Sequence, residues 1–135
     1  MAKILIIESN LDLQDFLSFF IKMQGYKVKA VSLETEVQES IENFKPDLIL
    51  LDVVYSGIDG REICRKIKKL NKDLLIILLS TDSKYLQNYE ECLADSAIEK
   101  PFNNEIILKT IKLLLHKKKH KKIGLIYTIV KIITS

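Results

Sequence analysis

This sequence alternates regularly between short apolar runs and segments whose apolar residues recur every three or four positions. Three of the apolar runs are almost unbroken Ile, Leu and Val. Such runs are typical of strands buried on both faces, so the alternation predicts an α/β fold: a parallel sheet between two helical layers. The expected strands are Lys3–Ile7, Lys27–Val31, Leu48–Asp52, Leu74–Leu79 and Ala97–Glu99.

Five helices are expected in the intervening segments, because their apolar residues fall on one face at helical spacing. Asn10, Asp59 and Asn103 are suitable N-caps. The fourth helix has the least clear apolar face. The helices are expected from Leu11 to about Gly25, Glu34 to Phe44, Asp59 or Gly60 to Leu70, Ser83 to Leu93, and Asn103 through Leu115.

The length of 135 residues suits one domain with its own core. We assign residues 1–116 to this domain and 117–135 to a C-terminal extension. No apolar run approaches the roughly 20 residues of a membrane span, and the N-terminus has no signal-peptide pattern, so a cytoplasmic protein is expected. Cys64 and Cys92 lack the close spacing of a zinc or redox site.

The extension is basic and then apolar. Residues 116–135 contain six of the 21 basic residues and none of the 18 acidic ones. The lysines could bind nucleic acid, but no arginine or helix-turn-helix follows to read bases. They could bind a membrane surface beside the apolar stretch 123–135. We expect a third arrangement, a continued fifth helix plus a strand-like appendage that packs on this domain or on a second copy.

Polar residues gather where the expected strands end. Glu8 and Ser9, Asp52, Ser80 and Lys100 each occupy such a position. The carboxyl ends of parallel strands meet at one edge of the sheet, where ligands bind in open α/β folds. Carboxylates, a hydroxyl and an ammonium group at this edge suit a phosphoryl group handled with a divalent cation.

Four segments resemble the chemotaxis-receiver-like family of bacterial response-regulator receiver domains. Pro46–Asp52 with Gly57–Gly60 resembles its phosphoacceptor strand and loop, and Lys100–Phe102 its lysine motif. Lys3–Glu8 and Gly25–Val28 are similar to its first strand and to the start of its second. The resemblance covers about residues 3–115 and implies a flavodoxin-like, doubly wound five-stranded sheet in the order 2-1-3-4-5 with five helices.

The resemblance also implies roles for individual residues. Asp52 would accept the phosphoryl group, Ser80 and Lys100 would bind it, and the Lys100–Pro101 bond would be cis. Mg²⁺ would be held by Asp52, the Val54 backbone carbonyl, Glu8 and, weakly, Ser9. The implied protein is a signalling domain rather than an enzyme, with only its own phosphotransfer and slow dephosphorylation. Its partners would be a sensor histidine kinase or phosphotransfer protein, a downstream protein and, in a homodimer, a second copy.

Three residues depart from the family pattern. Ser9 stands where the family has a second acid, and this loss should weaken Mg²⁺ binding by at least about 10–100-fold. Ala97 replaces an aromatic residue of the last strand, a role that Tyr85 could take. Ser56 replaces a proline, which should leave its loop freer.

These departures keep a second function open, a receiver-like interaction module that signals without efficient phosphorylation. A flavin-binding protein is a further alternative for this fold. It needs a phosphate-binding loop after the first strand, and residues 8–12, which include Glu8 and Asp12, would repel phosphate. A hydrolase is disfavoured because the chain has no Gly-x-Ser-x-Gly motif and both histidines, His116 and His120, lie in the lysine run, where like charge makes them poor metal ligands.

Overall fold

The computed structural model describes residues 1–55 and 57–134. Over these residues, five parallel strands form one sheet in the order β2-β1-β3-β6-β7. Counted along the chain, this is the predicted order 2-1-3-4-5, so the flavodoxin-like sheet is confirmed. The strands are β1 (Lys3–Ile7), β2 (Lys27–Val31), β3 (Leu48–Asp52), β6 (Leu75–Ser80) and β7 (Ser96–Glu99). A small antiparallel pair, β4 (Val54–Tyr55) and β5 (Ile58–Asp59), follows β3.

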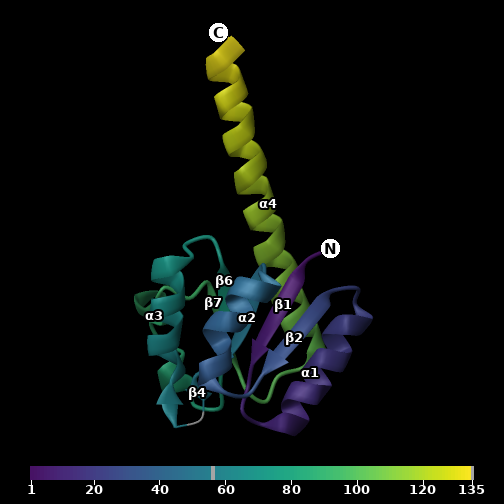
Figure 1. Ribbon diagram of the computed structural model, residues 1–135, viewed down its shortest axis with the longest axis vertical. Coiled ribbons are helices and arrows are strands. Elements are labelled where there is room, and N and C mark those ends of the chain that lie inside the picture. Colours follow the sequence, from purple (N-terminus) through teal and green to yellow (C-terminus); the bar gives the residue numbers. More distant parts are fainter. Residues whose placement is uncertain (56, 135) are drawn as a thin grey trace.

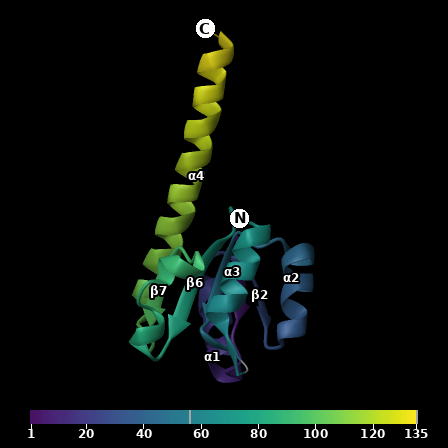
Figure 2. The same cartoon turned by 90° about the vertical axis from the view of Figure 1, so that its left-hand side faces the viewer.

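The sheet has a separate apolar core on each face. In β3, Leu48 and Leu50 belong to one core while Ile49 and Leu51 belong to the other, because successive strand side chains point to opposite faces. Helices α1 (Leu11–Met23) and α4 (Asn104–Thr134) cover the first face. Helices α2 (Val37–Phe44) and α3 (Gly60–Leu70) cover the second (Figures 1 and 2).

The expected fourth helix is wrong. Residues 83–93 instead form two short 3₁₀ segments, η2 (Ser83–Tyr85) and η3 (Tyr89–Cys92), so four α-helices lie within the described ranges rather than five. Asn88 and Leu93, which directly precede and follow η3, have φ of 56° and 69°, a left-handed conformation that interrupts a helix. Asn readily adopts it, and the weak apolar face of this segment offers little packing energy to favour a helix instead.

Helix α4 is 31 residues long and continues through the extension. Its first part packs on the sheet through Ile107 and Ile111, and the rest projects away from the domain (Figure 1). Residues 119–134 are exposed. Over the described residues 117–134 the extension is therefore helical, without the strand-like appendage, and its residues 119–134 do not pack on this domain. Among the described helices, none combines the length and hydropathy needed to cross a membrane.

Candidate functional site

The site lies at the carboxyl edge of the sheet. Asp52 is the last residue of β3 and Ser80 the last of β6, while Glu8 and Lys100 directly follow β1 and β7. The parallel register pairs Ile7 with Leu51 and Asp52 with Leu79, so these strands end at nearly the same level. Residues far apart in the chain thus enter one crevice.

The structure brings two carboxylates and one ammonium group together. Lys100 Nζ donates a hydrogen bond to Glu8 Oε1 at 2.6 Å and lies 3.6 Å from Asp52 Oδ2. Glu8 is 1% exposed and Asp52 8%. Charges so little exposed need compensation, and Lys100 supplies one positive charge for two carboxyl groups.

This imbalance shifts the carboxyl pKa values in opposite directions. Burial and then the adjacent Glu8 carboxylate raise the pKa of Asp52 to about 7, although Lys100 opposes the shift. Burial alone would raise the pKa of Glu8, but hydrogen bonds to Asp52 and Lys100 hold it below its usual value. The pKa values of the two carboxyl groups therefore move apart, as expected for two close acids.

The backbone that follows Asp52 packs tightly against the start of α3. The Val54 amide donates to Asp52 Oδ1 at 3.2 Å, which holds that oxygen at the start of the β4 turn. Gly60, where α3 begins, packs against the same turn, and its amide donates to the Val53 carbonyl at 2.5 Å. A Cβ at position 60 would collide with the Asp52 carbonyl oxygen and lie 2.9 Å from Val53 Cα. Only glycine fits this approach without a shift.

Mg²⁺ prefers oxygen ligands, and Glu8, Asp52 and the Val54 carbonyl can provide them. Two carboxyl groups face a single lysine in this crevice, so a divalent cation suits its charge. However, the part of the chain that the structure describes contains no group of three or more Asp, Glu, His or Cys side chains arranged for a metal. Ser9 is exposed beside Glu8 and adds only a hydroxyl. The donor set fits Mg²⁺ with one acid fewer than the family pattern.

Ser80 connects this crevice to the segment that follows β6. It is 1% exposed, and its Oγ accepts a hydrogen bond from the Asp82 amide at 3.1 Å. Asp82 in turn caps η2 by accepting from the Lys84 amide at 3.0 Å. Ser80 thus contacts its own loop rather than Asp52 among the described hydrogen bonds.

Arg61 was not predicted from the sequence. Asp59 is the N-cap of α3, as expected, and Arg61 makes hydrogen bonds of 2.8–3.2 Å to both oxygens of its carboxylate. The Arg61 guanidinium also lies 4.9 Å from the centroid of the Tyr85 ring, and Lys84 Nζ lies 5.1 Å from it. In the sequence, the contact between Arg61 and Asp59 was indicated only by the position of a positive charge two residues after a capping aspartate.

Tyr85 lines a hollow of about 220 Å³ beside the site, together with Val53, Val54 and Asp59. Ala97, at the place of the family's aromatic residue, is half-buried against the same apolar core as Tyr85. Ser56 lies outside the described residues.

Comparisons with known proteins concern the sequence and the fold of the chain. Residues 4–112 match the model of the response regulator receiver domain. A two-component response regulator from Clostridium difficile has a similar structure, with 27% identity, a TM-score of 0.80, and coverage of 86% of this chain and 97% of that one. A putative response regulator from Chloroflexus aurantiacus has 25% identity, a TM-score of 0.79, and coverage of 85% and 98%.

NtrX from Brucella abortus is 22% identical with a TM-score of 0.83, and the match covers 90% of this chain but only 29% of the NtrX chain. At that identity the likeness is one of fold. The family model, by contrast, spans most of the sequence and includes the four residues Glu8, Asp52, Ser80 and Lys100. This chain therefore belongs to the response regulator receiver domain family.

Proposed function

We propose that this receiver domain accepts a phosphoryl group on Asp52 and signals through a change in the segment after β6. The observation that carries the proposal is the pairing of Lys100 Nζ with both buried carboxylates, at 2.6 Å from Glu8 and 3.6 Å from Asp52. In this arrangement the Asp52 carboxylate provides the nucleophile, and Lys100 provides positive charge at the same point.

In the proposed reaction, a carboxylate oxygen of Asp52 attacks the phosphorus of a phosphohistidine on a sensor kinase or phosphotransfer protein. An O–P bond forms as the P–N bond breaks, and the leaving imidazole takes up a proton. Mg²⁺, held by Glu8, Asp52 and the Val54 carbonyl, would supply positive charge for the phosphoryl oxygens. Lys100 would exchange its contact with Glu8 for one with a phosphoryl oxygen.

The proposed switch begins at Ser80. Its hydroxyl would leave the Asp82 amide and donate to a phosphoryl oxygen, which removes the hydrogen bond that now holds the loop. The short segments η2 and η3 would then reposition Tyr85, whose ring is close to both Arg61 and Lys84. A downstream protein would bind this altered surface. The domain would act in the cytoplasm, catalyse only its own phosphotransfer and slow dephosphorylation, and could form a homodimer.

Intact mass spectrometry tests the phosphorylation. The protein is incubated with Mg²⁺ and acetyl phosphate, beside the variant Asp52→Asn and a control, Asp82→Asn, that changes an exposed aspartate of the same loop region. We expect a gain of about 80 Da, one phosphoryl group on the nucleophilic carboxylate, in the wild type and in Asp82→Asn only. A folded wild type that gains no mass would contradict the proposal.

The second candidate is a receiver-like module that binds its partner without efficient phosphorylation. The exposed hydroxyl of Ser9, in place of an acid, favours it. Titration with Mg²⁺ separates the two functions, because a domain with no affinity at millimolar Mg²⁺ could not support ordinary phosphotransfer.

A further inference from the structure

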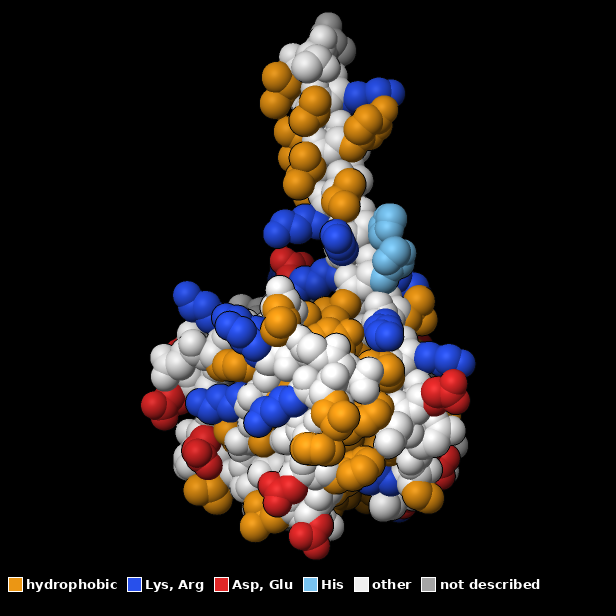
Figure 3. Space-filling view, turned by 90° about the vertical axis from the view of Figure 1, so that its right-hand side faces the viewer, with side chains coloured by type: hydrophobic (Ala, Val, Ile, Leu, Met, Phe, Trp, Pro, Cys, Tyr) orange, Lys and Arg blue, Asp and Glu red, His pale blue; other side chains and the backbone are white. Residues whose placement is uncertain are grey.

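We propose that residues 117–134 of α4 bind the surface of an anionic lipid bilayer, which would attach the receiver domain to a membrane independently of Asp52 phosphorylation. This half of the helix projects from the domain and its side chains are almost all exposed. Figure 3 shows apolar side chains gathered on the projecting part and lysines around its base.

The apolar surface of this segment is unusually broad. At 100° per residue, Ile123, Ile126 and Val130 follow one side of the helix, while Leu125 and Ile129 follow another. Their exposed fractions run from 47% to 61%. Apolar patches of this kind normally mark a binding surface.

One side of the segment carries a polar stripe along its whole length, while Lys118, Lys119, His120 and Lys122 lie on its other sides below the apolar part. Lys117, Lys121, Gly124, Thr128 and Lys131 follow one another at steps of four and three, which places them on a single side. A helix with a wide apolar face and a lysine-bearing stripe suits the interface of a bilayer, where the apolar face enters the acyl chains and the lysines stay with the headgroups.

Both threonine hydroxyls within the apolar part are already satisfied by the helix itself. Thr128 Oγ1 donates to the Gly124 carbonyl at 3.0 Å, and Thr134 Oγ1 donates to the Val130 carbonyl at 2.9 Å. Lys131 Nζ lies 5.4 Å from the centroid of the Tyr127 ring. These contacts lower the cost of moving the segment out of water, because an unpaired hydroxyl would be expensive in hydrocarbon.

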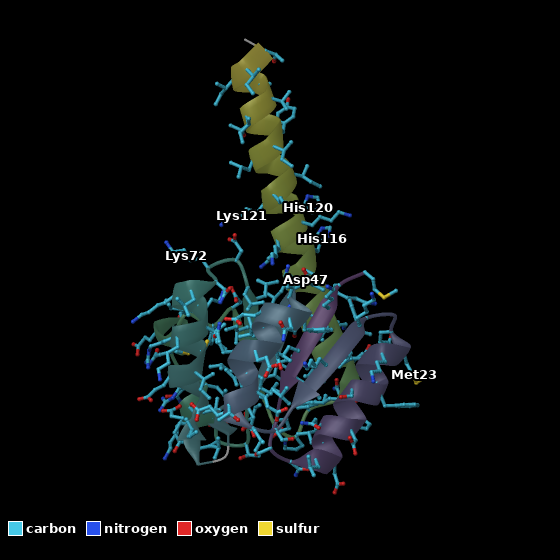
Figure 4. The ribbon with its side chains drawn as sticks, viewed as in Figure 1. Met23, Asp47, Lys72, His116, His120 and Lys121 are labelled. Atoms are coloured by element: carbon cyan, nitrogen blue, oxygen red, sulfur yellow. The ribbon has the colours of Figure 1, made fainter. Side chains whose placement is uncertain are left out.

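The domain adds basic side chains at the base of the projecting helix. Lys72, in the loop between α3 and β6, lies on the same side of the helix as Lys121 (Figure 4). Lys68, Lys72, Lys117, Lys118 and Lys121 line one hollow of about 230 Å³ with Asp73 and Asp95. Asp95 is paired with Lys68 at 2.6 Å. The surface that would face the headgroups is thus predominantly positive, which complements phosphate groups of anionic lipids.

A second copy of the chain fits this surface less well. A two-helix contact would cover one side of the segment and leave the other apolar side in water. A parallel pair would also bring two lysine runs, residues 117–122 of each copy, against each other, and like charges repel. A bilayer covers the whole apolar face and attracts the lysines.

A tryptophan probe tests the insertion directly, because the chain contains no tryptophan. Ile126→Trp places the probe at the centre of the apolar face. With vesicles of phosphatidylcholine and phosphatidylglycerol, we expect a blue shift of its emission and co-flotation of the protein. Vesicles of phosphatidylcholine alone should bind much less, and added salt should weaken the binding to the anionic vesicles.

Double variants in the Ile126→Trp background separate the contribution of the lysines from that of the apolar residues. Lys117→Gln with Lys121→Gln should lower the partition coefficient about 25-fold, at about fivefold per lysine, whereas Lys27→Gln with Lys29→Gln on the exposed part of β2 should not. Val130→Gln with Ile133→Gln should abolish the shift. Ile106→Gln with Leu113→Gln, which changes exposed apolar residues nearer the domain, should leave it intact.

Several results would overturn the proposal. They are no flotation by the folded protein, equal binding to neutral and anionic vesicles, and binding that survives the Val130 and Ile133 changes. Self-association in sedimentation velocity that those changes abolish, without vesicle binding, would assign the surface to a second copy. Lysine-dependent retardation of duplex DNA, again without vesicle binding, would assign the lysines to nucleic acid.

Discussion

Lys100 Nζ lies 2.6 Å from Glu8 Oε1 and 3.6 Å from Asp52 Oδ2, so the lysine pairs more closely with Glu8 than with the proposed phosphoacceptor. This contact joins residues 92 positions apart in the chain. It leaves Asp52 as the carboxyl group with the less complete charge compensation.

Replacing Lys100 should raise the pKa of Asp52 above its value of about 7, because Lys100 opposes the shift caused by burial and Glu8. Lys100→Met should therefore move the Asp52 carboxyl titration to higher pH and reduce phosphorylation by acetyl phosphate by at least about tenfold, the effect of losing roughly 1.4 kcal/mol of transition-state stabilisation. Carbon-13 NMR of the carboxyl groups measures the titration. Lys84→Met, which removes an exposed lysine, should change neither, and an unshifted Asp52 in Lys100→Met would contradict the assigned contact.

In Mg²⁺-free buffer, ionisation of Asp52 should make the folded protein less stable as the pH rises. The pKa of this carboxyl group is about 7 in the folded protein, against 3.8 for an unperturbed aspartate. A raised carboxyl pKa means that the folded state binds the proton more tightly, so the contribution of Asp52 is fully present below about pH 4 and is lost as the pH rises through about 7. Asp52→Asn avoids this loss.

The free energy of unfolding in urea, compared for wild type and Asp52→Asn at pH 5 and pH 8, measures the effect. We expect the advantage of the variant to grow by about 2 kcal/mol between the two pH values. Saturating Mg²⁺ at pH 8 should reduce that advantage, since the cation stabilises the ionised carboxylate of the wild type. An advantage independent of pH would argue against a raised pKa.

Gly60 should be irreplaceable because the chain approaches Asp52 and Val53 there. Gly60→Ala puts a Cβ 2.9 Å from both Val53 Cα and the Val53 carbonyl oxygen, and such overpacking against backbone should cost about 1–3 kcal/mol. Gly124→Ala is the matched control, because no atom lies within 4 Å of its added Cβ, and alanine should strengthen the helix by up to about 1 kcal/mol. Of the two substitutions, only Gly60→Ala should lower the midpoint of thermal unfolding. Equal midpoints for the two variants would refute the close approach.

Restoring an acid at position 9 should strengthen Mg²⁺ binding. Ser9→Asp adds a carboxylate next to Glu8, and we expect a gain in affinity of about 10–100-fold, the scale of losses at such positions. Isothermal titration calorimetry measures the change. Asn10→Asp adds the same charge one residue later, where the side chain caps α1 by accepting from the Leu13 amide at 3.1 Å. An equal gain in both variants would point to general electrostatic attraction rather than direct ligation.

The strands and the strongly periodic helices could be predicted from the sequence. Runs such as Leu48–Asp52 allow few alternatives, since uninterrupted apolar residues must be buried on both faces of a sheet. The N-caps Asn10, Asp59 and Asn103 were also predictable, because a cap depends on hydrogen bonds to amides only two or three residues away. The family resemblance pointed to Asp52 and Lys100 from their motifs alone.

The other features depend on contacts between distant parts of the chain. Residues 83–93 have weak local preferences, so their contacts with the core determined two 3₁₀ turns instead of a helix. The β-branched residues after Lys122 suggested a strand, yet a strand needs a partner, while a helix that already exists can add residues with hydrogen bonds of its own. The pairing of Lys100 with Glu8 and the raised pKa of Asp52 arise from burial and distance between parts of the chain that local sequence cannot encode.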